Sequence, residues 1–153
     1  MTPEANLARL ALVLPPAPRP VAVYLPLVIT HGLAYVSGHG PVRTDGSMVR
    51  GRVGVDLDLA QGRAAARQCG LAILATLRAE LGSLDRVARL VKMLGMVNSG
   101  PAFLEHPQVI NGCSELFADV FGPEYGIGAR SAVGMGPLPG NIAVEVEALF
   151  ELR

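Results

Sequence analysis

Tryptophan is absent from this chain of 153 residues, and aromatic side chains make up only 5% of it. Charged residues are scarce as well, at 17% against the roughly one quarter that is typical of soluble proteins. Because half of the residues are apolar, the chain has more apolar surface than one small domain can easily bury. We therefore predict a single domain that associates with further copies of itself.

The chain also has no excess of charge of either sign, since thirteen basic and thirteen acidic residues cancel. This balance argues against a nucleic-acid partner. No apolar run reaches the roughly 18 residues that span a bilayer, and the N-terminus lacks the features of a signal peptide. Cys69 and Cys113 lie far apart in apolar helical segments, so we expect two reduced, buried thiols. These features predict a cytoplasmic protein with no membrane partner.

Patterns that would hold a metal, a nucleotide or a catalytic serine are missing too. None of the regular spacings of a metal site is present among the histidines, which are His31, His39 and His106. The Gly38-x-Gly40 pair is too short for a dinucleotide fingerprint. Ser37 and Ser131 lack the context of a nucleophile elbow. We expect neither a metal nor a cofactor.

Hydrophobic periodicity and helix-capping residues predict an alternation of strands and helices. Thr2 is placed to cap a short N-terminal helix with Pro3 in its first turn, and Gly82 and Gly122 are placed to end the two long helices. The expected elements, in chain order, are a helix from residue 3, a hairpin of strands at 21–30 and 33–37, a short strand near 48–50, a helix from 56 or 58 to 81, a strand at 86–97, a helix at 107–121 and two final strands near 129–135 and 142–151.

This order indicates an α+β fold in which both long helices pack on one face of a single mixed sheet. The strand at 86–97 is apolar on both faces apart from Arg89 and Lys92, as expected of a strand that is covered on both sides. A neighbouring subunit could cover the second face. We expect residues 1–19 to form an N-terminal helix with a proline-rich lead, and residues 20–153 to form the domain.

Arg130 is the most informative candidate for a functional residue. Alternation in the last strand places one set of side chains on the core face, namely Ile142, Val144, Val146, Ala148 and Phe150, and leaves Glu145, Glu147 and Glu151 on the other. If residues 136–141 connect an antiparallel pair, Arg130 shares a face with these glutamates. The small neighbours Ala132 and Gly134 leave room for a bidentate grip on a carboxylate. The alternative is a cross-strand ion pair on a solvated face, which would contribute little.

For two further candidate site residues, a purely structural role is at least as well supported by the sequence as a role in a site. His39 lies between two glycines at the end of a strand, where it either belongs to a site or is an exposed loop histidine. Tyr24 is expected on an edge strand, where it either closes a pocket or packs on the strand surface.

Four segments carry a strong resemblance to the RidA/YjgF family: residues 36–41, the helix at 109–117, Ala129-Arg130-Ser131, and residues 138–148 with their Val-Glu-Val-Glu-Ala ending. The similarity covers residues 20–153. The asparagine-containing helix and the proline-rich lead resemble the longer branch of that family, often labelled endoribonuclease L-PSP or translation inhibitor.

The resemblance implies a chorismate-mutase-like fold assembled as a homotrimer, with ligand clefts between neighbouring subunits. It also implies hydrolytic deamination of reactive enamines and imines, such as 2-aminoacrylate, to a 2-keto acid and ammonia. The alternatives are a non-catalytic module that binds a 2-keto acid and, against the neutral charge, an endoribonuclease.

Carried onto this sequence, the resemblance makes Arg130 the clamp for the substrate carboxylate and Glu145 the residue that positions or activates water, with Glu147 structural. Tyr24 and Gly38 match the aromatic residue and the glycine that line the cleft. The remaining substrate-binding positions are His39, Ser131 and Ala132. Two of these depart from the family pattern, because Ala132 replaces the usual cysteine and His39 the usual glutamine.

Overall fold

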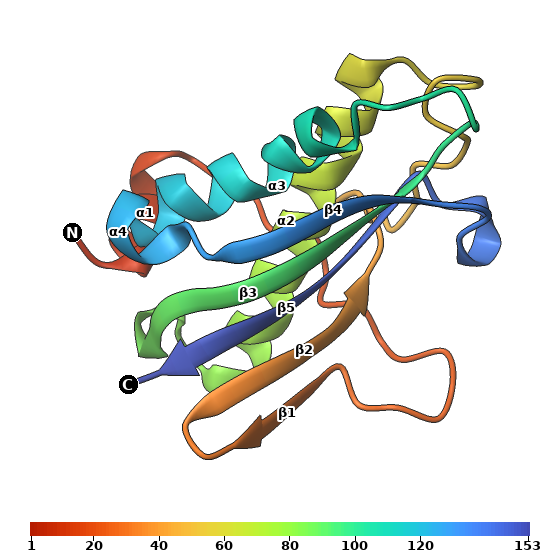
Figure 1. Cartoon of the computed structure of the whole chain (residues 1–153). Coiled ribbons are helices and arrows are strands. Elements are labelled where there is room, and N and C mark those ends of the chain that lie inside the picture. The colour runs from red at the N-terminus through yellow and green to blue at the C-terminus, as the bar shows by residue number, and fades with distance from the viewer.

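The computed structural model describes residues 1–153 and contains a single five-stranded mixed sheet in the order β1-β2-β5-β3-β4 (Figure 1). The strands are β1 (Leu27–Thr30), β2 (Leu33–His39), β3 (Val87–Asn98), β4 (Ala129–Met135) and β5 (Val144–Leu152). The helices are α1 (Pro3–Arg9), α2 (Leu59–Leu81), α3 (His106–Phe121) and α4 (Pro123–Gly126), with the short 3-10 turns η1 (Leu84–Arg86) and η2 (Pro139–Asn141). The predicted α+β class and the order of the main elements are confirmed.

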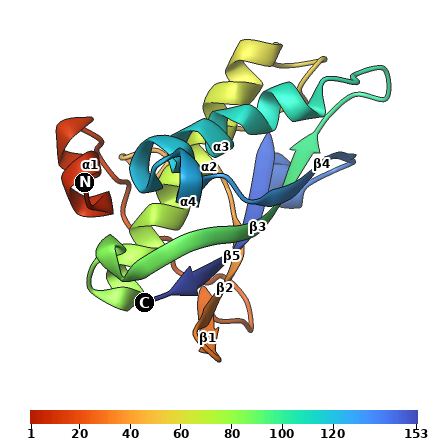
Figure 2. The ribbon, with the colours of Figure 1, turned by 60° about the vertical axis from the view of Figure 1, so that its left-hand side comes forward.

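The two long helices lie side by side on one face of the sheet, as Figures 1 and 2 show. Asp58 caps α2 through a capping box with Gln61, and Gly82 ends the helix in the left-handed conformation with φ 81°. The two helices approach closely at Gly112 of α3, where a Cβ would overlap the carbonyl oxygen of Arg63. The predicted apolar stripe of α3 is fully buried and consists of Val109, Cys113, Leu116, Phe117 and Val120.

The N-terminal helix α1 is fastened to the ends of the long helices. Thr2 caps it, as predicted, by accepting a hydrogen bond from the amide of Ala5. The carboxylate of Glu4 accepts from the amide of Leu84 and pairs with Arg78 at 3.3 Å. Leu7 of this helix belongs to the same hydrophobic core as the sheet and the long helices. The helix therefore packs against the ends of α2 and α3.

The predicted β1–β2 hairpin is present, but its first strand is shorter than expected. Its turn consists of His31 and Gly32, both with positive φ. The strand begins at Leu27 rather than at residue 21, because Pro26 cannot donate to a strand ladder and the preceding segment runs as exposed bends. This lead is attached to β2 through Ser37, whose hydroxyl donates to the carbonyl of Leu25 at 2.6 Å.

The expected antiparallel pairing of the last two strands is wrong. β4 pairs in parallel with β3 and forms an edge of the sheet, whereas β5 inserts antiparallel between β2 and β3. The connection between β4 and β5 crosses the end of β3, where the buried Asn98 side chain donates to the carbonyl of Ile142 at 3.1 Å. A hairpin and such a crossover both suit a loop of this length, so local sequence did not distinguish them.

The predicted alternation of β5 is confirmed. Val144, Val146, Ala148 and Phe150 are buried, whereas Glu147 and Glu151 are exposed. Cross-strand neighbours continue each face across the sheet. The helix-covered face is formed by rows such as Val36, Ala148 and Met93, and the open face by rows such as Tyr35, Leu149 and Lys92.

Candidate functional site

Arg130 stands on the helix-covered side of the edge strand β4. It is paired with Met93 of β3, which is 1% exposed and faces the helices. Its guanidinium reaches α3, donating from Nη1 to Ser114 Oγ at 2.9 Å and from Nη2 to the carbonyl of Pro107 at 3.3 Å. Arg130 forms no ion pair within the chain, so the alternative of a cross-strand ion pair is wrong. A guanidinium without a carboxylate partner is suited to bind an anionic ligand.

A pocket of about 250 Å³ opens beside Arg130, between α3 and the chain that enters β4. Its polar lining includes Asn111, Ser114 and Glu115, and Leu90 and Ile127 are among its apolar residues. Sequence analysis did not identify Asn111 or Ser114 as site residues. Their spacing of three along a helix, which places both on one face, is the signal that could have indicated them.

Glu145 lies on the open face of the sheet, at the level where β2 bulges. Its carboxylate covers Gly38 so closely that a Cβ on that glycine would overlap Glu145 Oε1. Partial burial, and secondarily the negative charge of Glu147, raises the pKa of the Glu145 carboxyl above its ordinary value. A carboxylate of raised pKa is a suitable general base near neutral pH. Gly38 and Glu145, each predicted separately as a site residue, are therefore neighbours in the structure.

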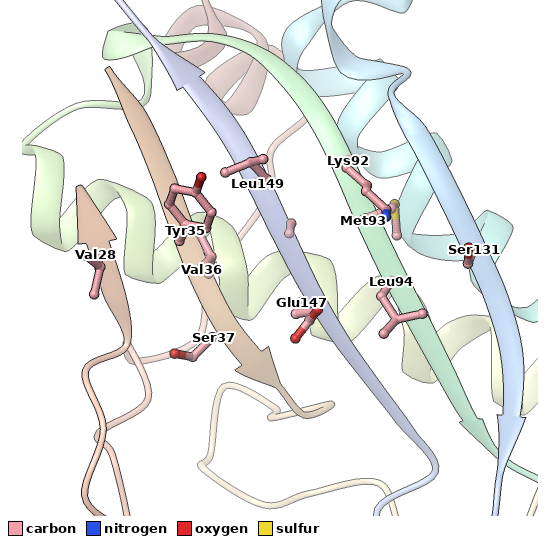
Figure 3. A pocket seen from close by; sticks show the side chains of 11 residues that line it. Val28, Tyr35, Val36, Ser37, Lys92, Met93, Leu94, Ser131, Glu147 and Leu149 are labelled. Atoms are coloured by element: carbon pink, nitrogen blue, oxygen red, sulfur yellow. The ribbon is translucent and has the colours of Figure 1, made fainter. Parts of the chain in front are cut away.

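A second and larger pocket, of about 420 Å³, lies in the middle of the open face (Figure 3). The side chains of Tyr35, Glu147 and Leu149 stand on this face with Lys92 across the sheet (Figure 3). Ser131 also lines this pocket. Ser131 and Glu147 thus lie on the same side of the sheet as Glu145, and Glu147 is accessible to a ligand or to another protein surface.

His39 belongs to the core and is 4% exposed, so the alternative of an exposed loop histidine is wrong. Its Nδ1 bonds the carbonyl of Ser37 at 2.6 Å, and its Nε2 bonds Thr76 Oγ1 of α2 at 2.7 Å. Since a carbonyl only accepts, Nδ1 carries the proton and the Thr76 hydroxyl donates to Nε2. Burial lowers the pKa of His39 below its ordinary value. Both ring nitrogens are occupied, so His39 supports β2 from within.

Tyr24 lies outside any strand, so its expected place on an edge strand is wrong. It belongs to the exposed lead to β1, whose next residue, Leu25, is hydrogen-bonded to Ser37. Tyr24 is 44% exposed. This placement brings Tyr24 to the end of β2 that also carries Gly38.

The predicted site residues fall into two groups on opposite faces of one subunit. Arg130 and Ala132 face α3, and Gly38 and Glu145 lie on the open side. The expectation that Arg130 shares a face with Glu145 is therefore wrong for a single chain. Its physical reason is the strand order, because β3 separates β4 from β5 and the crossover sets their relative register.

The remaining chemistry-bearing groups form no metal-binding centre. No three side chains of His, Cys, Asp or Glu gather where they could hold a metal ion. Cys69 and Cys113 are free and buried, as predicted, and burial raises the pKa of both thiols. None of the helices is long and apolar enough to cross a membrane.

Comparison with known proteins gives one consistent result. Residues 4–150 match the family described as "YjgF/chorismate mutase-like, putative endoribonuclease". Protein TCP17 of Trypanosoma cruzi is 45% identical over 149 residues, covering 97% of this chain and 93% of that protein.

Two solved structures are similar to this chain over nearly its whole length. The protein Atu1372 from Agrobacterium tumefaciens, of unknown function, is 42% identical with a TM-score of 0.89, over 99% of this chain and 94% of that one. RidA from Psychrobacter is 25% identical with a TM-score of 0.62, over 89% and 94% of the two chains. The fold is thus shared with RidA, and the detailed geometry more fully with the Agrobacterium protein.

Proposed function

The chain belongs to the YjgF/chorismate mutase-like family, and we propose that it hydrolyses small reactive enamines and imines of the 2-aminoacrylate type to 2-keto acids and ammonia. Arg130 holds the substrate carboxylate, and Glu145 positions and deprotonates the attacking water. No cofactor is needed, because an imine carbon is already electrophilic. Tyr24, Gly38, Ser131 and Ala132 line the cleft around the substrate.

The observation that carries the proposal is the unpaired Arg130 guanidinium. It has five N–H donors, of which two are used by Ser114 and Pro107. The remaining donors are free for a ligand carboxylate. A fixed cation of this kind orients a 2-imino acid so that one face of its reactive carbon is presented to water.

Glu145 supplies the base. As water oxygen bonds to the imine carbon, the C=N electron pair moves to nitrogen and Glu145 accepts a proton from the water. Glu145 then passes this proton to the nitrogen, which gives a carbinolamine. As the hydroxyl proton of the carbinolamine transfers by way of Glu145 to the amino group, the C–N bond breaks, ammonia leaves and the keto group forms. A positioned general base contributes about 10²- to 10⁴-fold to such a step, and the raised pKa of Glu145 favours this role near neutral pH.

Because Arg130 and Glu145 occupy opposite faces, we infer that they meet at one substrate only across a boundary between two copies. β4 presents a free strand edge beside Arg130, and the open face presents apolar Tyr35 and Leu149. Both surfaces are suited to contact another subunit. A homotrimer with clefts between subunits, which the family resemblance implies, would bring Arg130 and Glu145 to one substrate and would cover both surfaces. The two buried thiols suit a reducing cytoplasm.

The test is release of ammonia and 2-keto acid from 2-iminopropionate generated in place by an amino-acid oxidase. Arg130→Ala is expected to reduce kcat/KM by about 10²-fold or more, and Arg130→Lys to restore only part of it, because lysine lacks the bidentate geometry. Arg9→Ala is the matched control, since Arg9 is an exposed cation of α1. Full activity of Arg130→Ala would disprove the assignment.

A second candidate is a non-catalytic module that binds a 2-keto acid. The separation of Arg130 from Glu145 favours it, because a single subunit holds the clamp without the base. Calorimetry with pyruvate that shows binding dependent on Arg130, together with no turnover of any imine, would support this function. The endoribonuclease named in the family description would require RNA cleavage that Arg130→Ala or Glu145→Gln abolishes.

A further inference from the structure

Ser99 and His106 form a polar pair at the end of β4 that faces the N-terminus of α3. Ser99 follows β3 directly, and His106 is the first residue of α3. Ser99 Oγ lies 3.1 Å from His106 Nε2. The ring of Phe103 packs edge-on against the imidazole, with centroids 5.4 Å apart and an angle of 82° between the ring planes. The orientation of the histidine is therefore fixed from two sides.

Gly134 of β4 makes room for this pair. A Cβ at that position would lie 2.6 Å from His106 Nε2 and 3.0 Å from Ser99 Oγ, so a side chain there would displace the pair. The pair consequently rests directly on the backbone of the edge strand, and Gly134 itself is exposed.

The same side of β4 carries Arg130. Residues 130, 132 and 134 alternate onto one face of the strand, with only the methyl group of Ala132 between the arginine and the glycine. The guanidinium of Arg130 extends towards the start of α3, where it donates to the carbonyl of Pro107, the residue next to His106. Cation and imidazole therefore lie at the same end of one helix.

One nitrogen of His106 is free. Nε2 is bonded to Ser99, whereas Nδ1 forms no hydrogen bond within the chain and remains accessible in the half-buried residue. A neutral imidazole donates from one nitrogen and accepts at the other, so Nδ1 can bond a hydroxyl group in either tautomer.

We propose that Ser99 and His106 form a second anchoring point of the Arg130 site, which selects short 2-imino and 2-keto acids with a hydroxyl group at the end of the side chain. The inference rests on the proposed function for the role of Arg130. The carboxylate is held by Arg130, the carbon chain passes over Ala132, and the hydroxyl group bonds His106 Nδ1. Ser99 holds the imidazole in place.

The test compares two keto acids of nearly equal shape by calorimetry on the full chain. They are 4-hydroxy-2-oxobutyrate and 2-oxopentanoate, which differ by a terminal hydroxyl in place of a methyl group. Wild-type protein is expected to bind the hydroxy acid about tenfold more tightly, as one well-placed hydrogen bond allows. In His106→Phe, which retains a ring against Phe103, the ratio of the two dissociation constants falls to about one.

The controls separate this inference from the proposed function. His31→Asn, in the exposed β1–β2 turn, is expected to keep the wild-type ratio. Ser99→Ala is expected to reduce the ratio partially. Equal binding of the two acids by wild-type protein, absence of binding, or a preference that persists in His106→Phe would each overturn the inference. Binding of the keto acids that survives Arg130→Ala would instead overturn the role of the arginine. Both tests measure binding alone and do not depend on imine turnover.

Discussion

Arg130 and Glu145 lie on opposite faces of the same five-stranded sheet. Arg130 belongs to the row of Met93 and Ala148 beneath the helices, and Glu145 belongs to the row of Met96 on the open side. No rotation of either side chain can bring them to one small substrate through the backbone of the sheet. A reaction that needs both groups therefore needs two copies of the chain.

This relationship predicts complementation between two inactive variants. Arg130→Ala and Glu145→Gln subunits are each expected to form inactive assemblies. When they are unfolded together and refolded as a mixture, an interface that combines the intact arginine of one with the intact glutamate of the other is restored. Random mixing of equal amounts gives about a quarter of the wild-type activity per interface.

The measurement is the rate of ammonia release from 2-iminopropionate after refolding, with each variant refolded alone as the control. A mixture that remains as inactive as its components would show that the two residues do not act across a subunit boundary.

Gly38→Ala tests the position of the Glu145 carboxylate, which we propose activates water. The added Cβ would overlap Glu145 Oε1, so the carboxylate must move away from β2. We expect kcat to fall about tenfold or more, because a displaced base no longer reaches the water, while Arg130 still binds the carboxylate. Gly136→Ala is the control, since no atom lies within 4 Å of the Cβ it would add. Equal kinetics of the two variants would contradict the role of Glu145.

The burial of His39 is expected to make the folded protein less stable in mild acid. Because burial lowers its pKa in the folded chain, the unfolded chain binds a proton more readily. The free energy of unfolding should therefore fall as the pH decreases below about 6.5, by at most about 1.4 kcal/mol per pH unit from this one group. Above that pH the group is neutral in both states and contributes no slope.

Urea denaturation between pH 4.5 and 8 measures this effect. His39→Gln should flatten the dependence, whereas His31→Asn, at an exposed turn, should leave it unchanged. An identical slope in wild type and His39→Gln would show that the buried imidazole is not the titrating group.

The buried Asn98 side chain stabilises the crossover between β4 and β5, so its removal is expected to lower the stability of the fold. Its buried side chain donates to Asn141 Oδ1 at 3.0 Å and to the carbonyl of Ile142 at 3.1 Å, just before β5. Asn98→Ala leaves these acceptors unsatisfied and should reduce the free energy of unfolding by about 1–3 kcal/mol. Chemical denaturation measures this loss, with Thr44→Ala, in an exposed loop, as the control. No loss of stability would mean that water replaces the side chain.

Local sequence predicted the elements well because their determinants are local. The capping residues Asp58 and Gly82 set the ends of α2, and alternation in β5 identified its buried face. The partner of β4 was not predictable in this way, since a parallel and an antiparallel neighbour require the same alternation. That choice depends on the crossover held by Asn98, 43 residues from Asn141 in the sequence.

The candidate site was predictable only in part for the same reason. Arg130 stood out because its strand neighbours are small, but its contacts with Ser114 and Pro107 depend on how α3 docks. His39 looked exposed between two glycines, but it is buried beneath α2, where it bonds Thr76, a residue 37 positions away in the sequence. The family resemblance assigned both Gly38 and Glu145 to the cleft, but neither the resemblance nor any spacing in the chain predicted the contact between them.

The like charge of Glu147 offers a final test, because it acts on the pKa of Glu145 in a known direction. Burial is the main cause that raises this pKa, and Glu147 adds to it. Glu145 must be ionised to accept a proton, so kcat/KM for imine hydrolysis should fall on the acid side at a pH above the usual range of glutamate, which is centred at about 4.3. Glu147→Gln removes the negative charge, lowers the pKa of Glu145 and shifts this limb to lower pH.

The limb should nevertheless stay above the usual glutamate range, since the burial of Glu145 is unchanged by the substitution. Glu80→Gln, on the exposed surface of α2, is the control that should not shift the limb. The measurement is the pH dependence of kcat/KM for wild type, Glu147→Gln and Glu80→Gln. A limb that moves to higher pH in Glu147→Gln, or that is absent in wild type, would mean that a group other than Glu145 activates the water.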